Sequence, residues 1–411
     1  MTDQAVDTDG TAAGGAVPSP AAAPEPTSDQ FVGRSRELKE LRADIDRAGL
    51  DTLSGRKAPR ARVLLIAGRP GSGRTSLAEE LVRRVTGDYP DGVLRARLME
   101  PDGERVPTER TARDLLDALA VPAPPGAHAD DLCALLRDTL KDRRALLLLD
   151  DAVDAEQVDP LLPDTPECLV VAVSEGPLTG IPDVRPCTLG GLDKAAAVHL
   201  LARAAGPVRI TVDPGSAESL VEACAAHPAA LVLAGGWLSV RPKAALADLA
   251  KRVHDLPDEG SPLARVFRHT YASLSGPSAR VLRLLSLAPS GHVDPHTASA
   301  LAGCSVSGAK AALDDFAALG LVRRVGSAVP QYEVPGCLVP LLKALTETQD
   351  RPAELQLARA RMLERTVRLL QSCRAVTEPD ASAARKKLAG MPRALRFEGP
   401  GAAEEWLTVR E

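Results

Sequence analysis

The first half of the chain alternates between short apolar runs and segments of helical periodicity. Continuous apolar runs occur at RVLLIAG (62–68), in RALLLLDD (144–151) and in ECLVVAVS (167–174), and GVLRARL (92–98) is a weaker candidate. Short apolar runs of this kind are typical of strands buried on both faces of a parallel sheet. Apolar residues spaced three and four apart predict helices at 31–48, 75–85, 108–120 and 129–141, with a polar loop at 50–60. The alternation predicts a doubly wound α/β domain, which we place at 29–190.

After about residue 190 the pattern becomes helical. Helices are expected at 193–206, 216–226, 228–239 and 243–252, which we group as a small helical domain, 191–258. Further helices at 262–274, 277–287, 294–302 and 305–319 precede two short extended runs around Gly326, which predict a wing-like hairpin. These elements predict a winged-helix domain at 259–348. A long helix at 352–373 begins a C-terminal helical segment, 349–411, whereas residues 1–28 lack apolar periodicity and are expected to be a disordered leader.

Composition excludes several classes of function. The net charge of −5 gives no general attraction to nucleic acid or anionic lipid. Seven cysteines without CxxC spacing and seven histidines without paired spacing indicate neither a disulfide framework nor a zinc site. No signal peptide precedes the first domain, and no apolar run is long enough to span a bilayer. We therefore expect a cytoplasmic protein without a membrane partner.

The segment GRPGSGRT (68–75) carries the most specific chemistry. It fits the phosphate-binding loop G-x-x-x-x-G-K-[ST], with Arg74 in the place of the lysine. Glycines allow backbone amides to approach a phosphate, and the following helix adds partial positive charge at its amino terminus. A chance glycine-rich turn is the alternative, but the buried strand before the segment and the helix after it favour a phosphate loop. The predicted nucleotide-binding residues here are Gly68, Pro70, Gly71, Ser72, Gly73, Arg74, Thr75 and Ser76, with the Thr75 hydroxyl as a Mg²⁺ ligand.

Arg74 is expected to weaken this site. A P-loop lysine is a compact charge, whereas a guanidinium is larger and planar and must fit the same narrow space. The expectation is that ADP or ATP still binds, more weakly, and that hydrolysis is slow or absent.

A second motif, LLLLDD (146–151), follows about 75 residues later. A strand that delivers two acids at its carboxyl end is the Walker B arrangement. Asp150 would hold Mg²⁺ through water, and Asp151 would orient or deprotonate the attacking water. A strand that ends in a solvated acidic turn is the alternative, and the phosphate loop upstream favours the functional interpretation.

Together with these motifs, FVGR (31–34), GDYPDGVLRARL (87–98) and CLVVAVSE (168–175) resemble the NB-ARC NTPases. These AAA+-related proteins belong to the STAND class and occur in plant resistance proteins and actinobacterial regulators. CAAHPAALVLAGGWL (224–238) is similar to the GLPL segment of the family, 271–289 to the start of its winged-helix domain, and 394–411 to the segment that leads into C-terminal repeats. The resemblance implies that Val32 and Gly33 lie by the adenine, that Arg34 lies beside the pocket, and that Pro228 closes the nucleotide from the helical domain.

The sequence departs from the family at phosphate-sensing positions. Glu175 follows Ser174 where the family usually has an arginine that reads the γ-phosphate. Val334, Pro335 and Gly336 align with the family's His-Asp pair, whose histidine contacts the ADP β-phosphate. With Arg74, these changes predict a switch that has lost hydrolysis, nucleotide sensing, or both.

Charge argues against DNA binding by the winged-helix unit. The expected reader helix, 305–320, carries Lys310 against Asp314 and Asp315, and a helix that enters a DNA groove needs more positive charge. Arg323 and Arg324 are interpreted as a solvated edge. His227, next to Pro228, either faces the nucleotide or is a helix-end residue.

Two functional hypotheses remain. In the first, ATP or ADP with Mg²⁺ is held between the three domains and sets their orientation, so that the chain is a regulatory switch in signalling or transcriptional control. In the second, the chain is a non-catalytic scaffold that keeps the NB-ARC fold without using nucleotide. The sequence identifies neither the protein partners nor the signal, and it leaves a nucleotide-dependent oligomer open.

Overall fold

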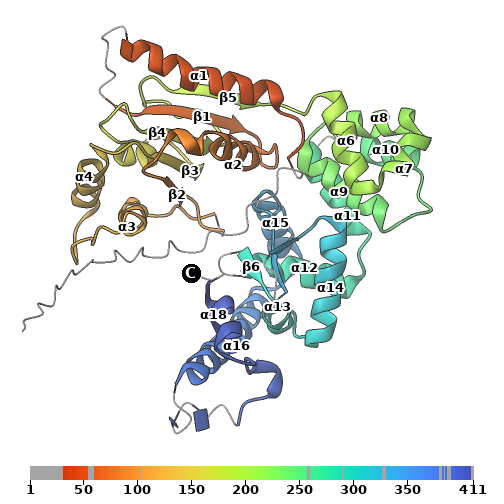
Figure 1. The fold of residues 1–411 in the computed structure, drawn as a ribbon. Coiled ribbons are helices and arrows are strands. Elements are labelled where there is room, and N and C mark those ends of the chain that lie inside the picture. Colours follow the sequence, from red (N-terminus) through yellow and green to blue (C-terminus); the bar gives the residue numbers. More distant parts are fainter. Residues whose placement is uncertain are drawn as a thin grey trace, which may run out of the picture.

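The computed structural model describes residues 31–53, 60–101, 103–256, 260–288, 291–325, 330–378, 382–383, 385–386 and 390–408. An α/β part holds the amino-terminal elements, and helices make up most of the rest of the chain (Figure 1). The predicted leader, 1–28, lies outside the described residues. Within them, no helix is both long and apolar enough to cross a bilayer.

Five parallel strands form the sheet of the α/β part, in the order β2-β3-β4-β1-β5. Their bounds are Arg62–Gly68 (β1), Val93–Arg97 (β2), Leu146–Ala152 (β3), Leu169–Ser174 (β4) and Arg185–Leu189 (β5). Strands β1 and β4 are buried nearly throughout, as expected of strands that are covered on both faces. The predicted parallel α/β sheet is confirmed.

Alternate side chains of β1 point to opposite faces of the sheet, and each face is covered by different helices. Leu64 and Ile66 pack with α1 (Ser35–Leu53) and α2 (Arg74–Val85). Val63 and Leu65 pack on the other face with α3 (Thr108–Ala118) and α4 (Ala129–Leu140). This period of two gives three layers, and the carboxyl end of β1 lies between those of its parallel neighbours β4 and β5 at one edge of the sheet.

Two predictions for the α/β part need correction. Helix α1 runs to Leu53, past Gly49 and through the first residues of the predicted polar loop, so this isolated glycine does not end the helix. The sequence pattern also missed β5. This strand lies at the edge of the sheet, contains Pro186 and is mostly exposed, so it lacks the apolar run that marked the other strands.

The helices after the sheet follow the predicted order with small shifts in their ends. Side chains cap several of them: Asp193 accepts a hydrogen bond from Ala196 N, and Asp213 accepts one from Ser216 N. Helix α7 was not predicted, because Gly206, with φ of +95°, separates it from α6 by a single residue. The bounds are Lys194–Ala205 (α6), Pro207–Val212 (α7), Pro214–Ala223 (α8), Pro228–Ser239 (α9) and Leu246–Asp255 (α10), whereas the short helix α5 (Ala155–Val158) lies between β3 and β4 in the α/β part.

The remaining helices surround a small antiparallel sheet of order β6-β8-β7. Strands β7 (Arg323–Val325) and β8 (Gln331–Glu333) match the predicted extended runs, whereas the turn around Gly326 lies outside the described residues. Strand β6 (His292–Val293) is too short to leave a sequence signal, and α15 (Val339–Gln349) was also missed. The other bounds are Pro262–Ala272 (α11), Gly276–Leu284 (α12), Pro295–Ala302 (α13), Val306–Leu319 (α14), Pro352–Thr377 (α16) and Pro400–Thr408 (α18).

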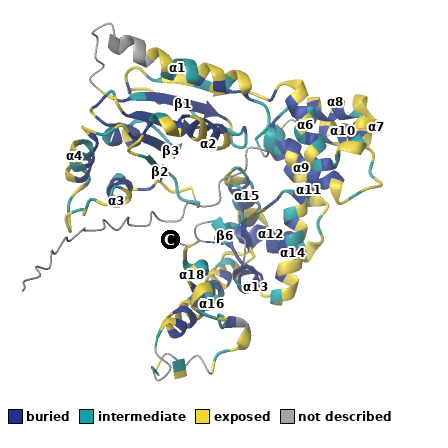
Figure 2. Cartoon of the chain, in the orientation of Figure 1, coloured by how far each residue is buried: buried dark blue, intermediate teal, exposed yellow. Residues whose placement is uncertain are grey.

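One hydrophobic core joins the two domains that the sequence placed at 191–258 and 259–348. Its buried members run from Leu192 to Met362, and Figure 2 shows residues coloured as buried along α9, α12 and α13. At its centre, α9 packs against α6, α11 and α14. Because their apolar side chains are shared, these two segments form a continuous interior.

Candidate functional site

The loop between β1 and α2 lies at the carboxyl end of an interior strand of the sheet. Strand β1 ends at Gly68, and α2 begins at Arg74 with Gly73 as its amino-terminal cap residue. Gly73 has φ of +90° and offers no side chain, so the first-turn amides of α2 have no side-chain cap. Carboxyl ends of parallel strands and helix amino termini are the usual place for phosphate groups.

The glycines of the loop have different environments. A Cβ on Gly73 would meet no atom within 4 Å, so this backbone borders open space that a ligand can enter. A Cβ on Gly71, which has φ of +79°, would lie 2.8 Å from the Cβ of Ala229 and 2.9 Å from Cε1 of His227. Sequence reasoning assigned both glycines to phosphate access. The structure gives Gly71 a second reason, which is the close approach of α9.

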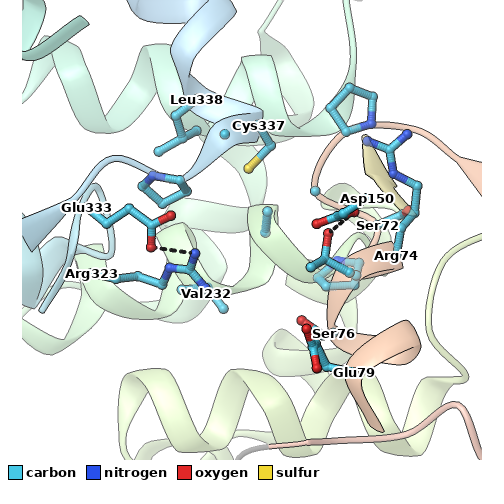
Figure 3. Close-up of a pocket in the computed structure, with 18 of the residues that line it drawn as sticks. Ser72, Arg74, Ser76, Glu79, Asp150, Val232, Arg323, Glu333, Cys337 and Leu338 are labelled. Carbon is cyan, nitrogen blue, oxygen red and sulfur yellow. Dashed lines mark hydrogen bonds and ion pairs between the residues drawn. The ribbon is translucent and has the colours of Figure 1, made fainter. Parts of the chain in front are cut away.

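Thr75 and Asp150 lie together across the site. The Thr75 hydroxyl donates to Oδ1 of Asp150 at 3.1 Å, drawn as a dashed line in Figure 3. Burial, with a smaller contribution from the charge of Asp151, raises the pKa of Asp150 to about 6. A hydroxyl and a carboxylate at this spacing are the groups expected to share a Mg²⁺ ion and its water.

Asp150 and Asp151 lie at an irregularity in β3. Between Leu149 and Ala152 the register with β4 shifts, and Asp151 has φ of +55°. Such a bulge redirects side chains at the end of a strand, and a non-glycine residue at positive φ carries local strain. The strand therefore turns its two carboxylates towards the loop rather than continuing the ladder.

Arg74 points back into the protein. Its Nη1 donates to the carbonyl oxygen of Gly68 at 2.9 Å. Its Nη2 lies 3.8 Å from Oδ1 of Asp151 and 3.7 Å from Oε1 of Glu175, and its side chain is only 9% exposed. The guanidinium is thus held by the base of the loop and flanked by two carboxylates.

Sequence reasoning did not identify Arg97. It is the last residue of β2, in register with Asp150, and its Nε and Nη2 each donate to Oδ2 of Asp151 at 3.3 Å. Arg97 could have been identified from its position. It is a charged residue at the carboxyl end of the strand next to the Walker B strand. Asp151 is therefore paired with two arginines.

Arg34 holds the loop from beneath. Its Nη2 donates to the carbonyl oxygens of Gly190 at 2.7 Å and Ser72 at 3.0 Å, and its Nη1 pairs with Glu37 at 2.8 Å. The side chain is buried, with φ of +60° at its backbone. Gly33 packs against α6, where a Cβ would lie 2.8 Å from the Cβ of Ala196.

The amino terminus of α9 contacts the loop directly. Nε2 of His227 donates to the carbonyl oxygen of Pro70 at 3.1 Å, and Ala229 N donates to the carbonyl oxygen of Gly71 at 3.2 Å. Nδ1 of His227 accepts from Ala230 N, which caps the helix. Burial lowers the pKa of His227. Of the two interpretations offered by the sequence, the structure favours the helix-end residue.

A cavity of about 1660 Å³ opens onto these groups. Figure 3 shows Cys337 and Leu338 on its other side, away from Arg74 and Asp150. Ten of the twelve predicted nucleotide-binding residues line it, and Gly33 and Gly68 do not. The lining members are Val32, Arg34, Pro70, Gly71, Ser72, Gly73, Arg74, Thr75, Ser76 and Pro228, together with Asp150 and Asp151.

Known proteins resemble both this sequence and this fold. A protein-family model described as an AAA domain matches residues 58–162. Regulatory protein AfsR of Streptomyces griseus is 29% identical over 349 residues, which cover 82% of this chain and 35% of that protein. Disease resistance protein RGA4 of Oryza sativa is 27% identical over 284 residues, which cover 63% of this chain and 27% of that protein. The matched part of the chain thus spans about a third of the length of AfsR and about a quarter of that of RGA4.

Among solved structures, a signal transduction ATPase with numerous domains from Pyrococcus horikoshii, which carries a tetratricopeptide repeat sensor, has a similar fold. The TM-score is 0.52 at 16% identity, and the match covers 86% of this chain and 51% of that one. The AAA-domain match, the two relatives and the shared fold together support a P-loop NTPase of the STAND type.

In this chain, the sequence departures lie around one cavity. Arg74, Glu175, Pro335 and Gly336 all line it, and a Cβ on Gly336 would lie 3.5 Å from Nη2 of Arg97. Cys337 follows them, and burial raises the pKa of its thiol to about 11, so the thiol stays protonated at neutral pH. The segment that aligns with the family's His-Asp pair thus contributes no side-chain cation.

Charged side chains of the proposed winged helix are paired with one another. Asp314 forms an ion pair with Lys310 at 2.9 Å. It also accepts hydrogen bonds from Arg324 and from the Tyr332 hydroxyl. Arg323 pairs with Glu333 at 2.9 Å. These interactions reduce the positive charge that the helix and hairpin present.

Proposed function

We propose that this chain binds ADP or ATP with Mg²⁺ and works as a regulatory switch with weak or absent hydrolysis. One observation carries the proposal. The Thr75–Asp150 pair for the metal is intact, whereas Arg74 is bonded to the loop's own Gly68 carbonyl and flanked by Asp151 and Glu175. The site therefore keeps the groups that bind a nucleotide and lacks a free cation at the lysine position.

The residues present fit a nucleotide. The open space at Gly73 accommodates phosphate oxygens near the first-turn amides of α2, and Thr75 and Asp150 would hold Mg²⁺, the latter through water. Bound Mg²⁺ would neutralise part of the phosphate charge. The resemblance assigns Val32 and Gly33 to the adenine and Pro228 to closure of the site. Val32 and Pro228 line the cavity, whereas Gly33 lies against α6.

Weak hydrolysis follows from the partners of Asp151. A residue that orients the attacking water needs a carboxylate oxygen directed at that water, and each oxygen of Asp151 already faces a guanidinium, Oδ1 that of Arg74 and Oδ2 that of Arg97. Asp151 pairs with Arg97 at 3.3 Å and lies 3.8 Å from Arg74. Slow turnover supports a role in which the bound state, and not the product, carries the signal.

The regulatory part of the proposal rests on the relatives and on α9. AfsR is named a regulatory protein, and α9 contacts the phosphate loop at one end and α14 further along. A nucleotide at the loop would then bias the orientation of the helical and winged-helix segments, 191–258 and 259–348, and so affect protein partners. Cytoplasmic location, a nucleotide-dependent oligomer and the lack of DNA binding remain predictions.

Thermal unfolding with ADP, ATP and Mg²⁺ tests the proposal. A nucleotide at 100 times its Kd adds about 2.7 kcal/mol of stability. The matched variants are Gly73→Ala, which places a methyl group beside the phosphate space, and Gly87→Ala, which lies outside the loop and also has open space at its Cβ. Each is compared with its own ligand-free transition. Gly73→Ala should lose the nucleotide-dependent shift, and Gly87→Ala should keep it.

A non-catalytic scaffold is the second candidate. It is favoured by the bonds from His227 and Ala229 to the loop, which join the two parts of the chain without a nucleotide. Absence of any thermal shift at millimolar ADP and ATP would support this candidate and overturn the first.

A further inference from the structure

We propose that Glu175 makes this site selective for nucleoside diphosphates over triphosphates. Its carboxylate competes with a third phosphate for the guanidinium of Arg74. This inference rests on the proposed nucleotide binding and specifies which ligand the site prefers.

The position of Glu175 follows from the sheet. It comes directly after β4, the neighbour of β1, so its backbone lies at the same sheet edge as the phosphate loop. The Ser174 hydroxyl accepts from Gly176 N at 3.3 Å and stabilises the turn after the strand. Oε1 of Glu175 then lies 3.7 Å from Nη2 of Arg74, and the side chain lines the cavity.

Arg74 has its hydrogen-bonding and charge requirements met within the protein. Its Nη1 donates to the Gly68 carbonyl, and its Nη2 lies between Asp151 and Glu175. To bind a further phosphate, this buried guanidinium must give up at least one of these partners. The amides at the start of α2 are not involved in this competition, so binding of the α- and β-phosphates is less affected.

The local charge is unfavourable for a third phosphate. This end of the cavity has three carboxylates and two guanidiniums. They belong to Asp150, Asp151 and Glu175, and to Arg74 and Arg97. Like charges at about 4 Å repel, and the repulsion is stronger where water is excluded. A diphosphate brings less charge to this end of the cavity than a triphosphate.

Exposure sets the size of the effect. The Glu175 side chain is 63% exposed, so water screens its charge, and we expect about a tenfold preference rather than an absolute one. The same exposure makes Glu175 replaceable without loss of the fold. Asp151, at 24% exposure and with two arginine partners, is the less suitable residue to vary.

Isothermal titration of the full chain tests the inference, with ADP and with β,γ-imido-ATP, both in the presence of Mg²⁺. The wild type should bind ADP about tenfold more tightly, a difference of about 1.4 kcal/mol. Glu175→Gln should bring the ratio close to one by strengthening the triphosphate analogue, while ADP affinity changes less than twofold.

Glu167→Gln is the matched control. Glu167 is exposed and precedes β4, at the opposite edge of the sheet, so the variant has the same change in net charge without a change at the site. Its ratio should equal that of the wild type. Equal wild-type affinities for the two ligands, or a Glu175→Gln variant that shifts both by the same factor, would overturn the selectivity. Binding of neither ligand would overturn the proposed function itself.

Discussion

Nε2 of His227 lies 3.1 Å from the carbonyl oxygen of Pro70, so the residue that caps α9 also bonds to the phosphate loop. The ring uses both nitrogens: one accepts from the helix, and the other donates to the loop. Neutral imidazole suits this arrangement, in agreement with the lowered pKa of the buried side chain. The loop thus has a protein contact on the face that α9 covers.

His227→Ala should lower the free energy of unfolding by about 1–2 kcal/mol, because it removes a helix cap and a buried hydrogen bond. His227→Asn should recover the part of this lost free energy that is due to the helix cap. Asparagine caps helices well but is too short to reach Pro70. Urea unfolding measures both variants. His199→Ala, on the exposed face of α6, is the control and should stay within about 0.5 kcal/mol of the wild type. Equal losses for the alanine and asparagine variants would show that the bond to the loop carries the stability.

Gly71→Ala should destabilise the protein by about 2–3 kcal/mol, because a methyl group at φ of +79° is strained and also collides with Ala229. Gly73→Ala has a similar φ but no collision, so its cost should be about 1–2 kcal/mol. Denaturant titration without nucleotide gives both values. Equal costs at the two positions would contradict the close contact between α9 and the loop.

Arg74→Lys should strengthen nucleotide binding by about tenfold, or about 1.4 kcal/mol. A lysine ammonium is a compact charge that suits a phosphate, whereas the guanidinium is held by Gly68 and flanked by Asp151 and Glu175. Titration with ADP and Mg²⁺ measures the change. Unchanged affinity would mean that the missing histidine of the segment at 334–336, and not Arg74, limits ADP binding.

The raised pKa of Asp150 predicts a loss of stability with rising pH in the nucleotide-free protein. Between about pH 4 and pH 6 the carboxyl ionises in the unfolded chain but stays protonated in the folded one, so the folded state binds more protons and its stability falls as the pH rises. Asp150→Asn has no such carboxyl. The wild type should therefore lose about 2 kcal/mol relative to this variant from pH 4 to pH 7. Denaturant unfolding in EDTA at several pH values tests this, and parallel curves would contradict it.

Local pattern was sufficient for the α/β part because its strands are buried on both faces. An apolar run such as 62–68 is typical of a strand buried on both faces, and the glycine loop and the two acids each come at the end of such a run. Strand β5 shows the limit of this reasoning. An exposed edge strand with a proline in it owes its conformation to its pairing with β1, which no local pattern records.

The site was predictable in its residue types but not in its contacts. The motif identified Arg74, Thr75 and Asp150, and the resemblance identified Glu175 as a departure. That Arg74 bonds to Gly68, and that Arg97 joins Asp151, depends on the order of the strands and on the bulge in β3. Side-chain direction at a bulge follows from tertiary packing, so sequence spacing alone did not give it.

Two adjacent glycines in α9 have a consequence for movement. A methyl group on Gly235 would collide with Ala204 of α6, and one on Gly236 would lie 2.5 Å from the carbonyl oxygen of Leu319 in α14. Neighbouring positions point about 100° apart around a helix, so the two contacts hold α9 from different sides. The helix can neither slide nor turn alone. A displacement that begins at its first turn has to carry α6 and α14 along as a rigid body.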